Sequence, residues 1–252
     1  MPINVLARRE FFRSRDNTEK QLTILREQGD IRYPEQVEDF LDFLTDAELK
    51  PTGSTPKFQQ LADKIESDIL SKNQIFYKPT VLQGKEIKVK VNQGLTIDLY
   101  NASSSIKQIT PLLLYLRYHA KPNDLLIIDE PEMNLHPESQ AKLLEVFAIL
   151  VNFGVNVLLT THSPYFMDHL NSLVSGKINH PQVLQTQANA LYLKDARAFL
   201  AFDKVSAYEM KDNQLSSLKD EDDDIRWDTL SDVSHDLQHK YFKIYEKGKA
   251  AR

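Results

Sequence analysis

The sequence contains no cysteine, which excludes disulfide bonds, thiolate metal sites and cysteine nucleophiles. Glycine is also scarce, with 7 residues in 252, and glycine is what phosphate-cradling loops are built from. Apolar stretches such as 125–128 and, with one asparagine, 155–159 have the length of strands and fall far below the roughly 20 residues of a membrane span. The charged N-terminus differs from a signal peptide, so we expect a cytoplasmic protein with no membrane partner.

The chain also lacks an excess of basic charge, because 31 Lys and Arg residues stand against 36 Asp and Glu residues, a net charge of −5. Only a local basic patch would then attract nucleic acid. What the chain does have is 41% hydrophobic residues, enough for a sizeable core in one large domain or two small ones.

Three parts are predicted from the periodicity of apolar residues. Residues 1–75 have a helical rhythm, with a linker at 50–56 and a third helix that contains Phe58, Leu61, Ile65 and Ile69. Residues 76–212 form an α/β core, and residues 213–252 form an acidic loop followed by a helix from about 228 to 246. Within the core, alternation predicts strands at 86–91 and 95–99 around a turn at Gly94, and two later strands at 190–193 and 205–210.

The centre of the core, from about residue 125 to residue 160, is predicted to be a βαβ unit. Apolar strands at 125–128 and 155–160 are separated by a helix that ends near Gly154, and strands of this buried type are typical of a parallel sheet covered on both faces. The fold class is therefore α/β, a parallel sheet with flanking helices behind a helical N-terminal segment.

Polar side chains follow both central strands. Asp129 and Glu130 follow the first, and Thr160, Thr161 and His162 follow the second. Open α/β sheets bind ligands at the carboxyl ends of their strands, so one carboxylate could hold magnesium and the other could polarise a water molecule, with His162 nearby. A structural charge pair and a structural histidine are the simpler alternatives.

A third cluster opens the helix that precedes these strands. Ser103, Ser104 and Ser105, followed by Lys107, stand where free backbone N–H groups and the helix dipole favour a phosphate. Ordinary N-capping by serine is the alternative.

In this order the motifs ASSSIKQ (102–108), LLIIDEP (125–131) and TTHSP (160–164) resemble the C-terminal half of an ABC-type ATPase of the AAA family. The similarity points to the SMC-like and OLD-like ATPases of bacterial defence systems, and MNLHP (133–137) resembles the segment after Walker B in the OLD-like branch. Ala102 replaces the leucine of the family signature, and Ser104 and Ser105 replace its two glycines.

The resemblance implies a partial P-loop NTPase fold and a role for each motif. Asp129 would hold Mg²⁺, Glu130 would be the catalytic carboxylate, and His162 would contact the γ-phosphate of ATP. The signature residues Ser103, Ser104, Ser105 and Lys107 would reach the nucleotide of a partner in a head-to-head dimer. Family members often act on DNA or control an effector nuclease.

One motif is missing from the printed sequence. None of its three Gly-Lys pairs completes the Walker A pattern G-x-x-x-x-G-K-[ST]. We therefore expect a half-ATPase that needs a Walker A lobe in trans or in a full-length protein, and that is inactive alone.

Two alternatives remain open. The chain could be a catalytically incomplete scaffold derived from such an ATPase. A nuclease using the acidic run 220–224 is the other, although after residue 180 no Glu-Gly pair accompanies an Asp-x-Asp, as the pattern of a TOPRIM nuclease requires. An acidic run is more simply a solvated loop.

Overall fold

The computed structural model describes residues 54–79, 85–91, 94–175, 181–211, 213–219, 225, 236 and 238–245. The helices predicted before residue 54, most of the linker and the acidic run 220–224 lie outside the described residues. The chain divides into two compact units. Among the described residues, the first unit runs to Asp124 and includes Met133–Leu135, and the second comprises Leu125–Glu132 and everything from His136 onward.

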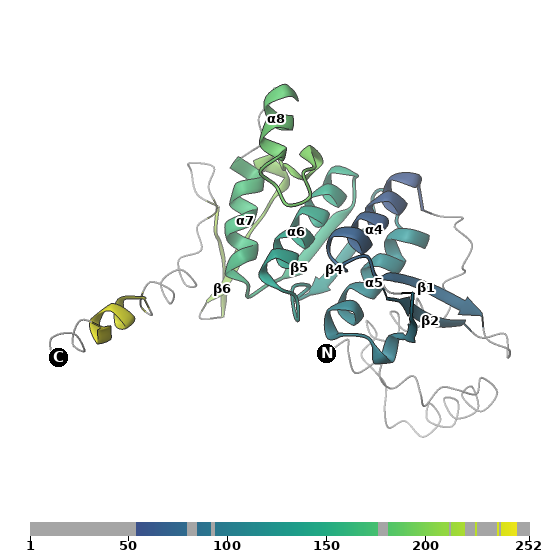
Figure 1. Cartoon of the computed structure of the whole chain (residues 1–252). Coiled ribbons are helices and arrows are strands. Elements are labelled where there is room, and N and C mark those ends of the chain that lie inside the picture. Colours follow the sequence, from purple (N-terminus) through teal and green to yellow (C-terminus); the bar gives the residue numbers. More distant parts are fainter. Residues whose placement is uncertain are drawn as a thin grey trace, which may run out of the picture. The chain divides into compact units, whose positions relative to one another are not determined.

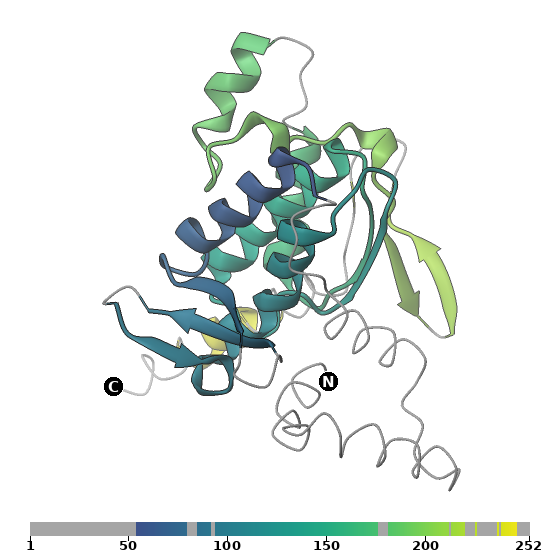
Figure 2. The same cartoon turned by 90° about the vertical axis from the view of Figure 1, so that its right-hand side faces the viewer.

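The first unit joins two helices to an antiparallel sheet of order β1-β2-β3 (Figures 1 and 2). Ile75 pairs with Val89 in the register of β1 and β2, and both side chains are buried. The elements are α4 (Pro56–Asp68), β1 (Gln74–Pro79), β2 (Lys85–Lys90), β3 (Thr96–Asp98), η2 (Leu99–Asn101) and α5 (Ser104–Tyr118).

The core of the first unit follows the predicted periodicity. Phe58, Leu61 and Ile65 of α4 are buried at helical spacing, as is the α5 row that includes Ile109 and Leu113. The predicted helix that contains Phe58 and the predicted strands at 86–91 and 95–99 are confirmed. Strand β1 was not predicted, because Phe76 breaks the alternation of its apolar residues.

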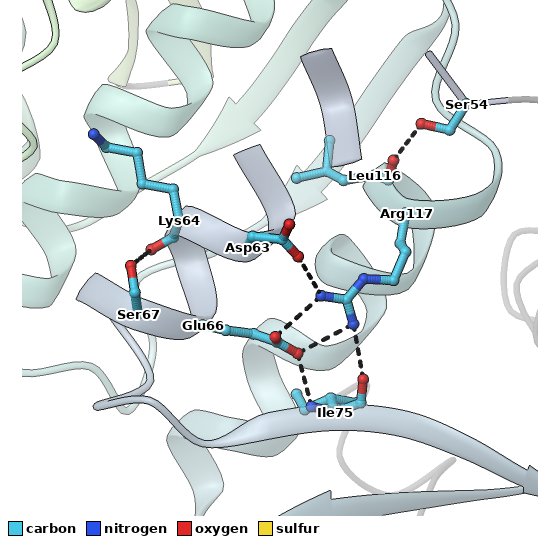
Figure 3. Close-up of polar contacts among 8 residues, drawn as sticks. All are labelled: Ser54, Asp63, Lys64, Glu66, Ser67, Ile75, Leu116 and Arg117. Atoms are coloured by element: carbon cyan, nitrogen blue, oxygen red, sulfur yellow. Dashed lines mark hydrogen bonds and ion pairs between the residues drawn. The ribbon is translucent and has the colours of Figure 1, made fainter. Parts of the chain in front are cut away.

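An ion pair fixes α4, α5 and β1 together in the same unit (Figure 3). Arg117 of α5 binds Glu66 of α4 through both carboxylate oxygens and also donates to the carbonyl oxygen of Ile75 at 2.9 Å. The Glu66 carboxylate accepts the Ile75 N–H at 2.7 Å. This polar cluster thus joins α4, α5 and β1 through one carboxylate and one guanidinium.

The second unit contains the βαβ motif. Strands β4 and β5 are parallel, in a register that runs from Leu125 opposite Asn156 to Asp129 opposite Thr160, which confirms the predicted connection. The elements are β4 (Leu125–Asp129), α6 (Pro137–Asn152), β5 (Asn156–Thr160), α7 (Pro164–Ser175), α8 (Pro181–Ala188), η3 (Ala196–Ala198), η4 (Phe202–Lys204), β6 (Tyr208–Lys211) and β7 (Gln214–Ser217).

Helix α6 connects the two parallel strands and forms the core of this unit. Its N-cap is His136, whose ring nitrogen accepts the Glu138 N–H at 3.3 Å, and Pro137 occupies the first turn. Gly154 follows the helix with a φ of 92°, a left-handed conformation that glycine adopts without strain. Residues 143–150 of α6 are all buried.

The prediction of a strand at 190–193 is wrong. The segment forms turns, with the Ala190 N–H bonded to the carbonyl of Gln187. Its alternating leucines are buried as in a strand, but the N–H groups of Tyr192 and Leu193 donate to the Glu145 carboxylate at 3.0 and 2.8 Å and not to a neighbouring strand. The strand predicted at 205–210 begins only at Tyr208.

The parallel strands are covered on one face only within the described part of the chain. Leu125, Ile127 and Leu158 share the other face and are 63%, 66% and 57% exposed. We call these three side chains the exposed strip. The prediction of fully buried strands is therefore wrong for this face. Of the predicted last helix, residues 236 and 238–245 are described and helical. Among the described helices, none combines the length and the apolar character that crossing a bilayer requires.

Candidate functional site

The candidate site of the second unit is the edge where β4 and β5 end. The Thr160 hydroxyl donates to the Asp129 carboxylate. The Glu130 N–H donates to the carbonyl and to the hydroxyl of Thr160, both at 3.2 Å. Because the strands are parallel, their carboxyl ends meet here, and these bonds join the two loops that follow.

Glu130 turns the chain sharply at this edge. Its φ is +45°, which is left-handed and strained for a residue with a side chain. The Glu130 carboxylate oxygen lies 3.0 Å from Nε2 of His162, as the topology predicts. The His162 side chain is 84% exposed and that of Glu130 is 33% exposed, so both groups can reach a ligand.

A residue that no sequence pattern identified lies beside this pair. Glu132 is only 6% exposed, and its Oε1 accepts hydrogen bonds from the Thr161 hydroxyl at 2.5 Å and from the His162 N–H at 3.1 Å. Its position beyond the strand end gives no periodic signal. The only signal available was the density of carboxylates in the segment DEPE (129–132).

The loop after β5 is anchored on its other side by α6. The Ser163 hydroxyl donates to the Gln140 side-chain oxygen at 2.5 Å, and the Ser163 N–H donates to the Thr161 hydroxyl at 3.0 Å. Three consecutive residues of this loop are thus hydrogen-bonded to defined partners, which leaves the His162 ring projecting from a fixed backbone.

The oxygen donors at this edge suit magnesium. Asp129 and Glu130 supply carboxylates and Thr160 supplies a hydroxyl. Within the described ranges, no three His, Asp or Glu side chains are arranged to hold a metal ion by themselves. Magnesium at phosphate-transfer sites binds one or two carboxylates and completes its shell with water and substrate phosphates, so the residues present fit it.

The serine cluster belongs to the first unit. Ser103 is the N-cap of α5 and accepts the Ile106 N–H at 3.4 Å, while its hydroxyl lies 2.9 Å from that of Ser105. Ser103 and Ser104 are exposed, and the Lys107 ammonium lies 5.5 Å from the centroid of the Tyr100 ring. The structure therefore brings Asp129, Glu130 and His162 together in one unit and holds the serine cluster in the other.

Comparison with known proteins gives one family. The family model described as "AAA domain, putative AbiEii toxin, Type IV TA system" matches residues 3–168. That range includes the serine cluster and both loops of the candidate site. No curated protein matches the chain at a significant level.

Proposed function

Because the chain belongs to the family described as "AAA domain, putative AbiEii toxin, Type IV TA system", an AAA-family ATPase domain, we propose that it is part of an ATPase that binds and hydrolyses ATP with Mg²⁺. The α/β architecture, a short parallel sheet with flanking helices, agrees with a partial P-loop NTPase fold. The finer assignment is an ABC-type, OLD-like or SMC-like ATPase that acts in anti-phage defence or a DNA-linked process.

The observation that carries the proposal is the contact between Glu130 and His162, 3.0 Å apart beside Asp129. A positioned general base contributes typically about 10²–10⁴-fold to a reaction rate. Glu130 is the proposed base: its carboxylate accepts a proton from the attacking water, and His162 keeps that carboxylate oriented and contacts the γ-phosphate.

Asp129 is the proposed magnesium residue. Magnesium, when bound, would neutralise charge on the phosphate oxygens, which is the main requirement of phosphoryl transfer. The Thr160 hydroxyl, hydrogen-bonded to Asp129, would hold the carboxylate in its orientation at the strand end.

The serine cluster is proposed to bind the nucleotide of a second head. Ser103, Ser104, Ser105 and Lys107 lie at the N-terminus of α5, where N–H groups and the helix dipole favour an anion. A head-to-head dimer would bring this cluster to the phosphates of the partner.

The exposed strip supports the proposal that a further lobe is needed. Parallel sheets are almost always covered on both faces, yet Leu125, Ile127 and Leu158 are exposed. The printed sequence has no Walker A pattern to cradle the β- and γ-phosphates. A Walker A lobe, in trans or in a full-length protein, would supply the cradle and cover the strip.

A catalytically incomplete scaffold is the second candidate. It is favoured by the role of Ser103 as an ordinary N-cap and by the serines that stand in place of the signature glycines. Such a scaffold would bind a partner protein and turn over no ATP. It gives no reason for two carboxylates and an exposed histidine at the strand ends.

The test is Mg²⁺-dependent ATP hydrolysis and nucleotide affinity of the 252-residue chain, alone and mixed with any Walker A lobe that is encoded beside it. We expect no turnover from the chain alone and turnover on mixing. Glu130→Gln is the matched control, because it keeps the shape of the side chain and removes the base. It should lower turnover by about 10²–10⁴-fold and spare ATP binding.

Each other outcome has a defined meaning. Inactivity in both arms supports the scaffold. Turnover by the chain alone contradicts the need for a second lobe. A Glu130→Gln variant that hydrolyses ATP at the normal rate removes Glu130 from the role of base.

A further inference from the structure

Three glutamates are buried in the described part of the chain, and one of them differs from the others. Glu66 and Glu145 use both carboxylate oxygens as hydrogen-bond acceptors. Glu132 uses Oε1 for two hydrogen bonds, while its Oε2 is buried and has no partner in the described structure. A buried polar atom without a partner is costly, and its presence in a folded protein calls for a reason other than stability.

The bonds that Glu132 does make lie in the candidate site. It accepts from the Thr161 hydroxyl and from the N–H of His162, which are consecutive residues of the loop after β5. Glu130, two residues earlier in the chain, contacts the ring of the same histidine. One short segment, 130–132, therefore holds His162 at two points, by its ring and by its backbone.

We propose that Glu132 is a positioning residue that fixes the His162 backbone so that the His162 ring stays in contact with the Glu130 carboxylate. This inference rests on the proposed function, because the contact between His162 and Glu130 matters through its effect on ATP turnover. Glu132 acts through His162 and has no direct role toward the nucleotide.

The surroundings of Glu132 argue against a purely structural role. The donors that it binds belong to Thr161, which is half-buried, and to His162, which is exposed. If Glu132 were apolar, water could satisfy both donors, and the burial of an incompletely bonded carboxylate would be relieved. An apolar residue would serve the stability of the unit at least as well.

The experiment uses two nearly isosteric variants of the full chain. Glu132→Gln keeps an oxygen acceptor for Thr161 and His162, and Glu132→Met removes it, while both variants lose the charge. The first readout is the hydrogen exchange of the His162 amide by NMR. We expect slow exchange in the wild type and in Glu132→Gln, and exchange at least tenfold faster in Glu132→Met. The amide of Glu130, which donates to Thr160, is the internal control.

The second readout is turnover in the assembled ATPase. Misplacement of a catalytic group by about 1 Å can cost about 100-fold in rate. Glu132→Met should therefore lower kcat by about 10–100-fold with little change in KM, and Glu132→Gln should retain most of it. In a His162→Ala background, Glu132→Met should lower kcat no further, because both substitutions then act on the same group. The unfolding midpoint of Glu132→Met should equal or exceed that of the wild type.

Several results would overturn the proposal. The His162 amide of Glu132→Met could remain protected, or Glu132→Gln could be as defective as Glu132→Met. A Glu132→Met chain that unfolds would assign Glu132 to the stability of the unit. If the wild-type assembly hydrolyses no ATP, the proposed function fails, and the exchange data still decide whether Glu132 fixes the His162 backbone.

Discussion

Glu66 in the first unit and Glu132 in the second are both buried carboxylates, and they differ in what neutralises them. Glu66 faces a cation, since the Arg117 guanidinium lies 3.1 Å from its Oε1 and 3.0 Å from its Oε2 (Figure 3). Among the described residues, Glu132 accepts hydrogen bonds only from a hydroxyl and one backbone N–H. A charge that is fully paired serves the stability of its surroundings. A charge that is paired in part, beside exposed residues, is better explained by the position it imposes on them.

The pKa of Arg117 reflects this pairing. Burial of the guanidinium lowers its pKa, but the hydrogen bonds and charges of Glu66 and Asp63 outweigh that effect, so the net pKa is raised. The cation and the carboxylate depend on each other, and removal of either one leaves a buried charge without its partner. The contrast with Glu132 can be tested by substitutions in both units.

The largest effect on stability is expected for Arg117→Met. The substitution leaves Glu66 charged and mostly buried, which costs about 3–5 kcal/mol. Denaturant unfolding measures it. The double variant Glu66→Met, Arg117→Met should recover most of the loss. If the single variant loses under about 1 kcal/mol, the pair contributes little and the contrast with Glu132 disappears.

A smaller loss is expected for Glu145→Met in the second unit. Glu145 accepts from His169 Nε2 at 2.8 Å and from the N–H groups of Tyr192 and Leu193. Hydrogen bonds to a charged group contribute about 1.5–3 kcal/mol each, but removal of a fully buried carboxylate also relieves its desolvation cost and offsets much of that sum. We expect a loss of about 2–3 kcal/mol in thermal or denaturant unfolding. An unchanged free energy of unfolding would mean that Glu145, as proposed for Glu132, does not stabilise the unit.

The serine cluster allows stability and function to be separated at one residue. Ser103→Ala removes the N-cap of α5 and should cost about 1 kcal/mol in unfolding free energy. Ser103→Asp caps as well as serine does, so its stability should match the wild type, but its charge would repel a phosphate. Loss of turnover in Ser103→Asp, whose stability matches the wild type, supports nucleotide contact. Normal turnover in both variants would mean that Ser103 caps α5 and does not contact the nucleotide.

The smallest effect is expected for the pH dependence of the first unit. Burial, with a contribution from Lys121, lowers the pKa of His119 below its ordinary value. Above about pH 6.5 the His119 side chain is neutral in both the folded and the unfolded chain, so its protonation costs no stability there. Below it the unfolded chain binds the proton more readily, and stability is lost. His119→Gln should weaken the fall of the unfolding midpoint between about pH 7.5 and about pH 5. An unchanged fall would assign the pH dependence to other groups.

Much of the fold could be predicted from the sequence, because periodicity reports which faces are buried. The helices α4, α5 and α6 and the parallel pair β4 and β5 follow from it. The strand prediction at 190–193 failed because its buried leucines alternate as in a strand, while the N–H groups of Tyr192 and Leu193 donate to a side chain. Periodicity carries no information on hydrogen-bond partners.

The site was predictable in part for the same reason. Asp129, Glu130 and His162 stand at strand ends, and parallel topology by itself predicts that the ends meet. Glu132 has no such marker, because its contacts depend on the left-handed turn at Glu130, which alternation does not encode. The roles of these residues remain predictions.

The exposed strip has a consequence for the abundance of the protein. A chain that presents Leu125, Ile127 and Leu158 to solvent offers an apolar surface to chaperones, proteases and other chains. If a second lobe covers that surface, the amount of surviving chain follows the amount of that lobe, and unassembled copies are removed. The two halves of the proposed ATPase would then be matched in number by protein turnover, without any matched control of their synthesis.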